Sequence, residues 1–247
     1  MLNSKNYYEM NELANEYKRE CNLNELNPIE IFSTMQEKIK NLTIVFLLMD
    51  ENISGAAYKK SNQNIIFINS THSLGRQRFT LAHEIYHLKY DKTRFNLCGV
   101  KSNDEIEKKA DNFASCFLMS HGALIAYKKE NNIETWNLNN ILKTEQYFQI
   151  SHQAFLWRIR NLEEITYKEY SNFKQKPIQT LACSNGYDLK LYQPYSNKKN
   201  HTIGNYIKLT NKAFENDIIS PGKKDELLLD AFCGEINNLN SPEGLIE

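Results

Sequence analysis

Hydrophobic and polar positions alternate with two different periods along the first part of this chain. Apolar residues at helical spacing predict helices over residues 6–21 and 28–40. A continuous apolar run then predicts a buried strand over 43–49. Two β-like segments, 52–60 and 64–69, are separated by Ser-Asn-Gln and predict a short hairpin. This part of the chain therefore combines helices with a small sheet.

Helical periodicity dominates the rest of the chain. The segment after Gly75 lacks Gly and Pro up to residue 90 and predicts a helix, with Thr71 or Ser73 as its N-cap. Residues 92–103 predict a polar loop, which either borders a substrate cleft or merely connects two helices. Further helices are predicted over 104–119 and its continuation to 131, 136–148, 151–162, 205–216 and 220–236. The predicted fold class is α+β, mainly helical with a small sheet or hairpin.

Composition changes near residue 168. Residues 168–177 are charged and polar, which is typical of a linker. Beyond them, a small hairpin around Asn185-Gly186 is predicted from two short segments, 178–182 and 189–192.

A length of 247 residues suits one or two domains. We expect a first domain over residues 1–168 and a small C-terminal α/β extension over 169–247. The extension carries no chemical motif. It either binds a partner or positions a substrate, or it only covers the core.

The helix predicted over residues 76–90 contains His83-Glu-Ile-Tyr-His87, an H-E-x-x-H pattern. Residues four apart lie on one face of a helix, about 6 Å apart along its axis. Two imidazoles so placed can each give one nitrogen to a zinc ion at about 2.0–2.1 Å. Glu84 lies about 100° around the helix from His83, beside the metal, where it can take a proton from metal-bound water. The alternative is a pair of surface histidines on an amphipathic helix.

Zinc needs a third protein ligand and an open position for water. The next predicted helix carries Ala110, Ala114 and Phe117 on its apolar face, and Glu107 lies almost in line with that face. A carboxylate aimed into a core is costly unless a partner such as a metal compensates it. The two alanines also let a neighbouring helix approach closely. We therefore predict Glu107 as the third ligand.

Asp111 lies one turn after Glu107, on nearly the same side of the helix. A metal-bound histidine usually donates its other ring N–H to a carboxylate or carbonyl. Asp111 is a candidate for that role, with His83 as the favoured donor. Two alternatives remain: Asp111 is only a solvated acid at the edge of the face, or Asp111 binds the metal in place of Glu107.

The pattern of these motifs resembles the ImmA/IrrE family of metallo-endopeptidases. The resemblance covers roughly residues 28–165 and rests on the segments 53–56, 64–69, 78–87, 107–114, 117–119, 148–151 and 154–162. It implies a zincin-like core in which a short β-hairpin precedes the active-site helix. It also implies Zn²⁺ held by His83, His87 and Glu107, with Glu84 as the catalytic residue in peptide-bond hydrolysis.

Members of such families often cut a DNA-binding repressor and so release genes of mobile elements or stress responses. The resemblance therefore implies a protein substrate, and we expect a separate helix-turn-helix repressor, because residues 1–41 are too short to contain a repressor domain. An alternative from another class is a toxin-like or regulatory binding partner of such a repressor, with a structural or vestigial zinc site.

Composition narrows the classes of partner. The formal net charge is zero and the pI is about 7.0, so we expect no direct nucleic-acid binding, although Arg158 and Arg160 lie in a helix-turn-helix-like pair around Ser151. The strongest apolar run, 44–49, is too short to span a bilayer, and the polar start does not resemble a signal peptide. Five dispersed cysteines without a C-x-x-C pair indicate free thiols in a reducing compartment. We therefore expect a cytoplasmic protein without a membrane partner.

Overall fold

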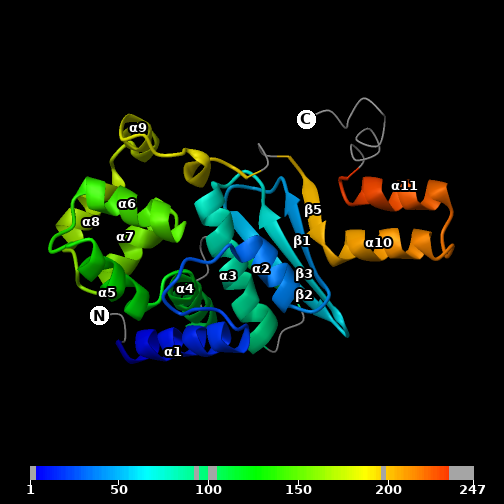
Figure 1. Ribbon diagram of the computed structural model, residues 1–247, viewed down its shortest axis with the longest axis horizontal. Helices are drawn as coiled ribbons and strands as arrows, with labels where there is room; N and C mark the ends of the chain where they lie inside the picture. Colours follow the sequence, from blue (N-terminus) through cyan, green and yellow to red (C-terminus); the bar gives the residue numbers. More distant parts are fainter. Residues whose placement is uncertain (1–3, 92–94, 100–104, 196–198, 234–247) are drawn as a thin grey trace.

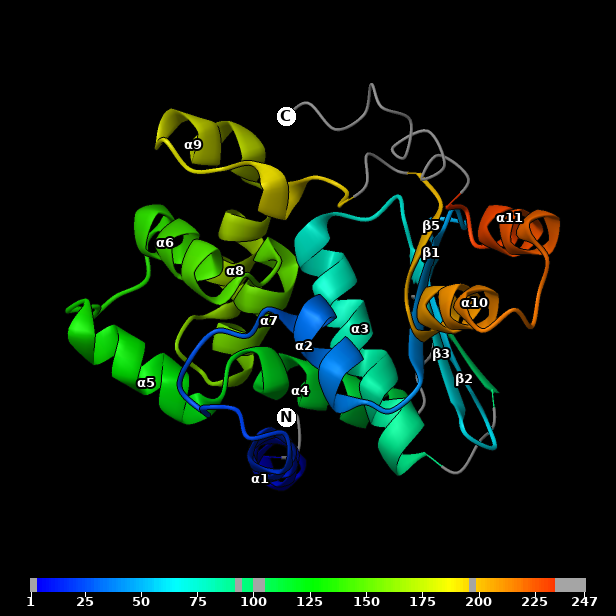
Figure 2. The ribbon, with the colours of Figure 1, turned by 45° about the vertical axis from the view of Figure 1, so that its right-hand side comes forward.

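The computed structural model describes residues 4–91, 95–99, 105–195 and 199–233 (Figure 1). It confirms a mainly helical α+β fold, in which a five-stranded sheet lies on one side of a long helix, α3, and most other helices gather on the opposite side (Figure 2). In chain order the elements are α1 (Ser4–Glu20), α2 (Ile31–Lys38), β1 (Leu42–Leu47), β2 (Ile53–Lys60), β3 (Gln63–Asn69), α3 (Leu74–Tyr90), β4 (Phe95–Gly99), α4 (Glu105–Leu118), α5 (His121–Glu130), α6 (Leu138–Phe148), α7 (His152–Asn161), α8 (Tyr167–Lys174), α9 (Ile178–Ser184), the 3₁₀ turn η1 (Lys190–Tyr192), β5 (His201–Gly204), α10 (Asn205–Glu215) and α11 (Pro221–Asp230).

The sheet has the strand order β4-β2-β3-β1-β5. Strand β1 runs parallel to β3, and the other neighbouring pairs are antiparallel. Ile44 and Phe46 of β1 are fully buried and stand in register with Ile66 and Ile68 of β3, which are also fully buried. Helices α2 and α3 pack against these strands. The predicted strand at 43–49 and the predicted hairpin before the central helix are therefore confirmed.

Helix α3 lies in the interior, between the sheet and α4. Residues 80–88 are all buried, including His83 and His87. Ala110 and Ala114 of α4 are also fully buried, which allows α4 to approach α3 closely, as predicted. Because the sheet covers α3 on one side and α4 covers it on the other, His83 and His87 are not surface histidines, and that alternative is excluded.

The polar segment 92–103, predicted as a loop, contains the strand β4. This strand pairs antiparallel with β2 and forms one edge of the sheet. Its strand conformation depends on the backbone edge that β2 offers, which the local side-chain pattern does not encode. Residues 92–94 and 100–104 lie outside the described part of the chain, and a role of this segment beside a cleft stays a prediction.

Two predictions for residues 168–192 were wrong. Most of the predicted linker belongs to the helix α8, which begins with a capping box: the Thr166 side chain accepts from the Glu169 N–H, and the Glu169 carboxylate accepts from the Thr166 N–H. The predicted hairpin consists of α9 and η1. Asn185 is the C-cap of α9, and Gly186 has φ +75°, a left-handed conformation that ends a helix as readily as it forms a hairpin turn.

The last elements lie at the edge of the sheet opposite β4. His201 begins β5, which pairs antiparallel with β1. The predicted helices α10 and α11 follow, beyond this edge (Figure 2). Helix α11 ends at Asp230, earlier than predicted, and residues 234–247 are outside the described part of the chain. No described helix combines the length and apolar character that crossing a bilayer requires.

The helical corner between α6 and α7 is a packing element. Ser151 caps α7 by accepting from the Ala154 N–H. Arg158 is buried, and its Nη1 lies 3.3 Å from both Ser115 Oγ and Cys116 Sγ of α4. This arginine faces the core and is not available to a nucleic acid.

Cys21, Cys116, Cys183 and Cys233 are free thiols, and the Cys98 side chain lies outside the described part.

Candidate metal centre

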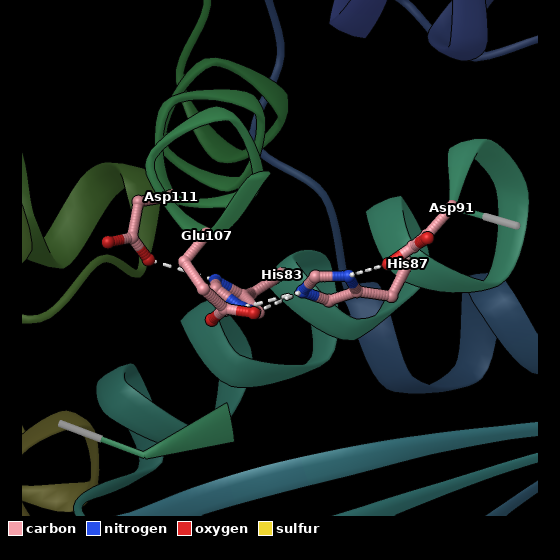
Figure 3. Close-up of polar contacts among 5 residues, drawn as sticks. All are labelled: His83, His87, Asp91, Glu107 and Asp111. Carbon is pink, nitrogen blue, oxygen red and sulfur yellow. Dashed lines mark hydrogen bonds and ion pairs between the residues drawn. The ribbon is translucent and has the colours of Figure 1, made fainter. Parts of the chain in front are cut away.

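Helices α3 and α4 bring His83, His87 and Glu107 together (Figure 3). His83 Nε2 lies 3.1 Å from His87 Nε2 and 3.2 Å from Glu107 Oε2, and His87 Nε2 lies 3.3 Å from Glu107 Oε1. The two histidines come from successive turns of α3, and Glu107 comes from the first turn of α4. The three groups predicted as metal ligands thus form one cluster.

The outer nitrogens of both rings contact carboxylates. His83 Nδ1 lies 2.8 Å from Asp111 Oδ1, and His87 Nδ1 lies 3.2 Å from Asp91 Oδ2 (Figure 3). An ionised carboxylate only accepts hydrogen bonds, so each Nδ1 carries the proton. In a neutral imidazole the other nitrogen, Nε2, then presents a lone pair. Both inner nitrogens are therefore acceptors that face Glu107, itself an acceptor.

Three atoms with lone pairs that converge on one point form the kind of ligand set that binds a divalent cation. Zinc binds histidine nitrogen and carboxylate oxygen at about 2.0–2.2 Å, so two ligand atoms at adjacent corners of a tetrahedron lie about 3.3 Å apart. The observed separations of 3.1, 3.2 and 3.3 Å lie close to that value. The residues present therefore fit a zinc ion in both chemistry and spacing.

The charge of Glu107 suits this role. Burial raises the pKa of its carboxyl, but in the absence of an ion a protonated His83 or His87 ring donates to it, and these hydrogen bonds and charges outweigh burial and hold that pKa well below its usual range. Glu107 is therefore ionised at neutral pH. It brings negative charge to a cluster whose side chains are at most 13% exposed.

Glu84 lies on a different side of α3, against strand β2. Its side chain is fully buried. A methyl group added at Gly55 of β2 would lie 3.0 Å from Glu84 Oε1, and 2.6 Å from both Thr80 Cγ2 and the carbonyl oxygen of Phe67. A glycine is needed for the strand to approach the helix this closely. Glu84 is thus not one of the three clustered residues, and its carboxylate lies against β2.

The geometry also separates the alternatives for Asp111. Glu107 faces the inner nitrogens of both histidines, whereas Asp111 contacts the outer nitrogen of His83. This arrangement favours Glu107 over Asp111 as the third ligand. The Asp111 side chain is 53% exposed, so this residue is both partly solvated and in contact with His83.

Sequence reasoning missed Asp91. This residue follows His87 by four positions and is the C-cap of α3. The signal that identifies it is the same i, i+4 spacing that relates the two histidines. That signal is weak at the end of a helix, because a side chain there is as often solvated as it is turned back along the helix.

Comparison with known proteins agrees with the site. The family model of the IrrE N-terminal-like domain matches residues 37–160, half of the chain, from just before β1 into α7. The matched segment contains His83, Glu84, His87, Asp91, Glu107 and Asp111. A search of functionally curated proteins found no match. From the matched segment and the metal-ligand cluster within it, we conclude that this chain belongs to the ImmA/IrrE family of metallopeptidases.

Proposed function

We propose that this chain is a zinc-dependent metallo-endopeptidase. The observation that carries the proposal is the convergence of His83, His87 and Glu107 at separations of 3.1 to 3.3 Å, with both histidine rings held by carboxylates at their outer nitrogens. Membership in the metallopeptidase family supports the reaction class. The donor set of two imidazoles and one carboxylate supports zinc as the metal.

The residues of the chain divide the chemistry between them. His83, His87 and Glu107 would hold the ion. A zinc ion bound there would supply Lewis acidity, lowering the pKa of a water molecule toward about 7 and polarising the scissile carbonyl. The Glu84 carboxylate would accept a proton from the attacking water and then deliver it to the leaving amine nitrogen. Burial against β2 restricts this carboxylate to few orientations, which favours both transfers.

The substitution Glu84→Gln tests the enzyme assignment. We expect the variant to bind one zinc ion per chain as the wild type does, because Glu84 is not a ligand. Its cleavage of an unstructured protein such as casein should fall by at least about 10²-fold, because the proton acceptor is lost. A fully active Glu84→Gln protein would refute the assignment. Zinc bound by the wild type without any peptide cleavage would instead favour a structural site in a binding protein.

For the substrate, we propose a separate helix-turn-helix repressor. The resemblance to the ImmA/IrrE family supports it. The two N-terminal helices pack against the core of the structure: the Tyr17 ring of α1 lies 5.5 Å from the Phe117 ring of α4, and the Phe32 ring of α2 lies 5.4 Å from the Phe46 ring of β1, between ring centroids. Residues 4–38 are therefore not a separate repressor domain.

Incubation with a helix-turn-helix protein encoded beside this gene tests the substrate proposal. We expect cleavage by the wild type, detected by intact mass spectrometry, and no cleavage with a chelator or with Glu84→Gln. A repressor that stays intact with a wild type able to cut casein would refute the substrate and leave the peptidase in place. Tight binding without cleavage would favour the regulatory binding partner.

A further inference from the structure

Two carboxylates contact the outer nitrogens of the histidines, and they differ in their surroundings (Figure 3). Asp111 comes from α4, and its side chain is 53% exposed. Asp91 comes from the end of α3, and its side chain is only 8% exposed. The ring that Asp91 contacts, His87, is 1% exposed, whereas the His83 ring is 9% exposed.

Asp91 is tied to His87 at two points. The Asp91 N–H donates to the His87 carbonyl oxygen at 3.2 Å, which closes the last turn of α3. The His87 Nδ1–H donates to Asp91 Oδ2, also at 3.2 Å. Backbone and side chain of the same two residues are thus joined. Rotation of the imidazole away from the cluster would break the second contact while the first still holds the aspartate in place.

The solvent exposure of the two carboxylates indicates which contact holds its histidine ring more strongly. The Asp111 contact is shorter, 2.8 Å against 3.2 Å. Solvent competes for the Asp111 carboxylate, however, and screens its charge. Where water is excluded, a charge-assisted hydrogen bond is stronger, and its loss leaves a buried N–H without a partner. The difference in exposure between 53% and 8% therefore outweighs the difference in length.

We infer that Asp91 is the principal positioning residue of the metal centre, and that it acts on the metal through His87. The inference rests on the proposed zinc site. The Asp91 carboxylate fixes the Nδ1–H tautomer, directs Nε2 toward Glu107 and His83, and increases the basicity of Nε2 as a ligand. Asp111 does the same for His83 with a smaller effect. A substitution of Asp91, at the end of α3, should therefore alter the metal site through the His87 ring.

Zinc affinity measured by competition with a chromophoric chelator tests this inference without any substrate. We expect Asp91→Ala to weaken zinc binding by about 10- to 100-fold. Asp91→Asn keeps an acceptor oxygen but not the charge, so it should recover part of that loss. Asp111→Ala should cost less than Asp91→Ala. Asp188→Asn, an exposed aspartate outside the site, serves as the control and should bind as the wild type does.

A second readout separates positioning from general destabilisation. With Co²⁺ in place of zinc, the visible absorption bands report the ligand geometry. Asp91→Ala should shift these bands, while its circular dichroism and its melting temperature without metal stay near those of Asp91→Asn. Asp91→Ala with wild-type zinc affinity and an unchanged cobalt spectrum would overturn the inference, as would a larger loss in Asp111→Ala. A wild type that binds no zinc would overturn the proposed function, and this inference with it.

Discussion

Glu107 Oε2 of α4 lies 3.2 Å from His83 Nε2 of α3, although a whole strand, β4, separates the two helices in the chain. The contact exists because α4 packs closely on α3 through Ala110 and Ala114, both fully buried. Helix packing and ligand geometry are thus parts of one arrangement. Four experiments follow from it and from the surrounding core.

The variant Glu107→Gln should bind zinc far more weakly than the wild type. It replaces an ionised ligand with a neutral amide of nearly the same shape, so loss of the ligand charge dominates the effect. The loss should exceed the roughly 100-fold that removal of an outer partner costs. Metal content after dialysis, measured by mass spectrometry, checks this. A variant that retains full zinc while Asp111→Asn loses it would show that Asp111 is the ligand.

Zinc should stabilise the folded chain by mass action. At a free concentration 100 times the dissociation constant, the free energy of unfolding should rise by about 2.7 kcal/mol, because the unfolded chain does not hold the three ligands together. Urea unfolding with zinc and with a chelator measures the difference. The double variant His83→Ala/His87→Ala should show none. A wild type equally stable in both conditions would contradict a zinc site.

Gly55→Ala should lower both stability and activity. The added methyl group would lie 2.6 Å from Thr80 Cγ2 and from the Phe67 carbonyl oxygen, and 3.0 Å from Glu84 Oε1. Separating β2 from α3 to relieve this overlap should cost about 1–3 kcal/mol and displace the Glu84 carboxylate. Thermal unfolding and casein cleavage measure the two effects. Gly222→Ala in α11 is the matched control, because nothing lies within 4 Å of the added carbon, and it should not destabilise the protein.

The buried pair of Glu145 and His152 should make stability fall as pH rises. Burial lowers the pKa of His152, but the hydrogen bond to Glu145 at 2.6 Å and the Glu145 charge outweigh it, so the pKa is raised above 6.5. Burial also raises the pKa of Glu145 above 4.5. A group whose pKa is raised by folding contributes stability that is complete below its unfolded pKa and is lost as pH rises through its folded pKa. For His152 that loss begins near pH 6.5 and extends upward.

The pair is tested by urea unfolding at several pH values from about pH 6 to about pH 8.5, a range that brackets the ordinary histidine pKa. The wild type should lose stability across this range relative to the double variant Glu145→Gln/His152→Gln, which has no titrating pair. Tyr192→Phe, which removes the 2.9 Å hydrogen bond from Tyr192 to Glu145 and keeps the aromatic ring, should lower stability yet keep the pH dependence. Parallel curves for the wild type and the double variant would exclude the pair as the source.

Local patterns in the sequence identified most of the helices and all of the proposed ligands. The spacing of His83 and His87 requires only that the segment be helical, and Glu107 stands out because a carboxylate in an apolar stripe demands a partner. These arguments depend on residues close together in the chain. They were wrong where a local signal has two structural uses, as at Asn185-Gly186, which ends α9 where a hairpin turn was expected.

The sequence by itself determined the α+β class, the helix that holds His83, Glu84 and His87, and the acid that completes the set. The tertiary structure decided what depends on contacts between distant segments. It formed β4 and β5 on strand edges that no local pattern reveals, placed Gly55 against Glu84, and withdrew Asp91 from water while leaving Asp111 half-exposed. The physical reason is that periodicity and capping act over one or two helical turns, whereas burial and the pairing of strand edges are properties of the whole packed chain.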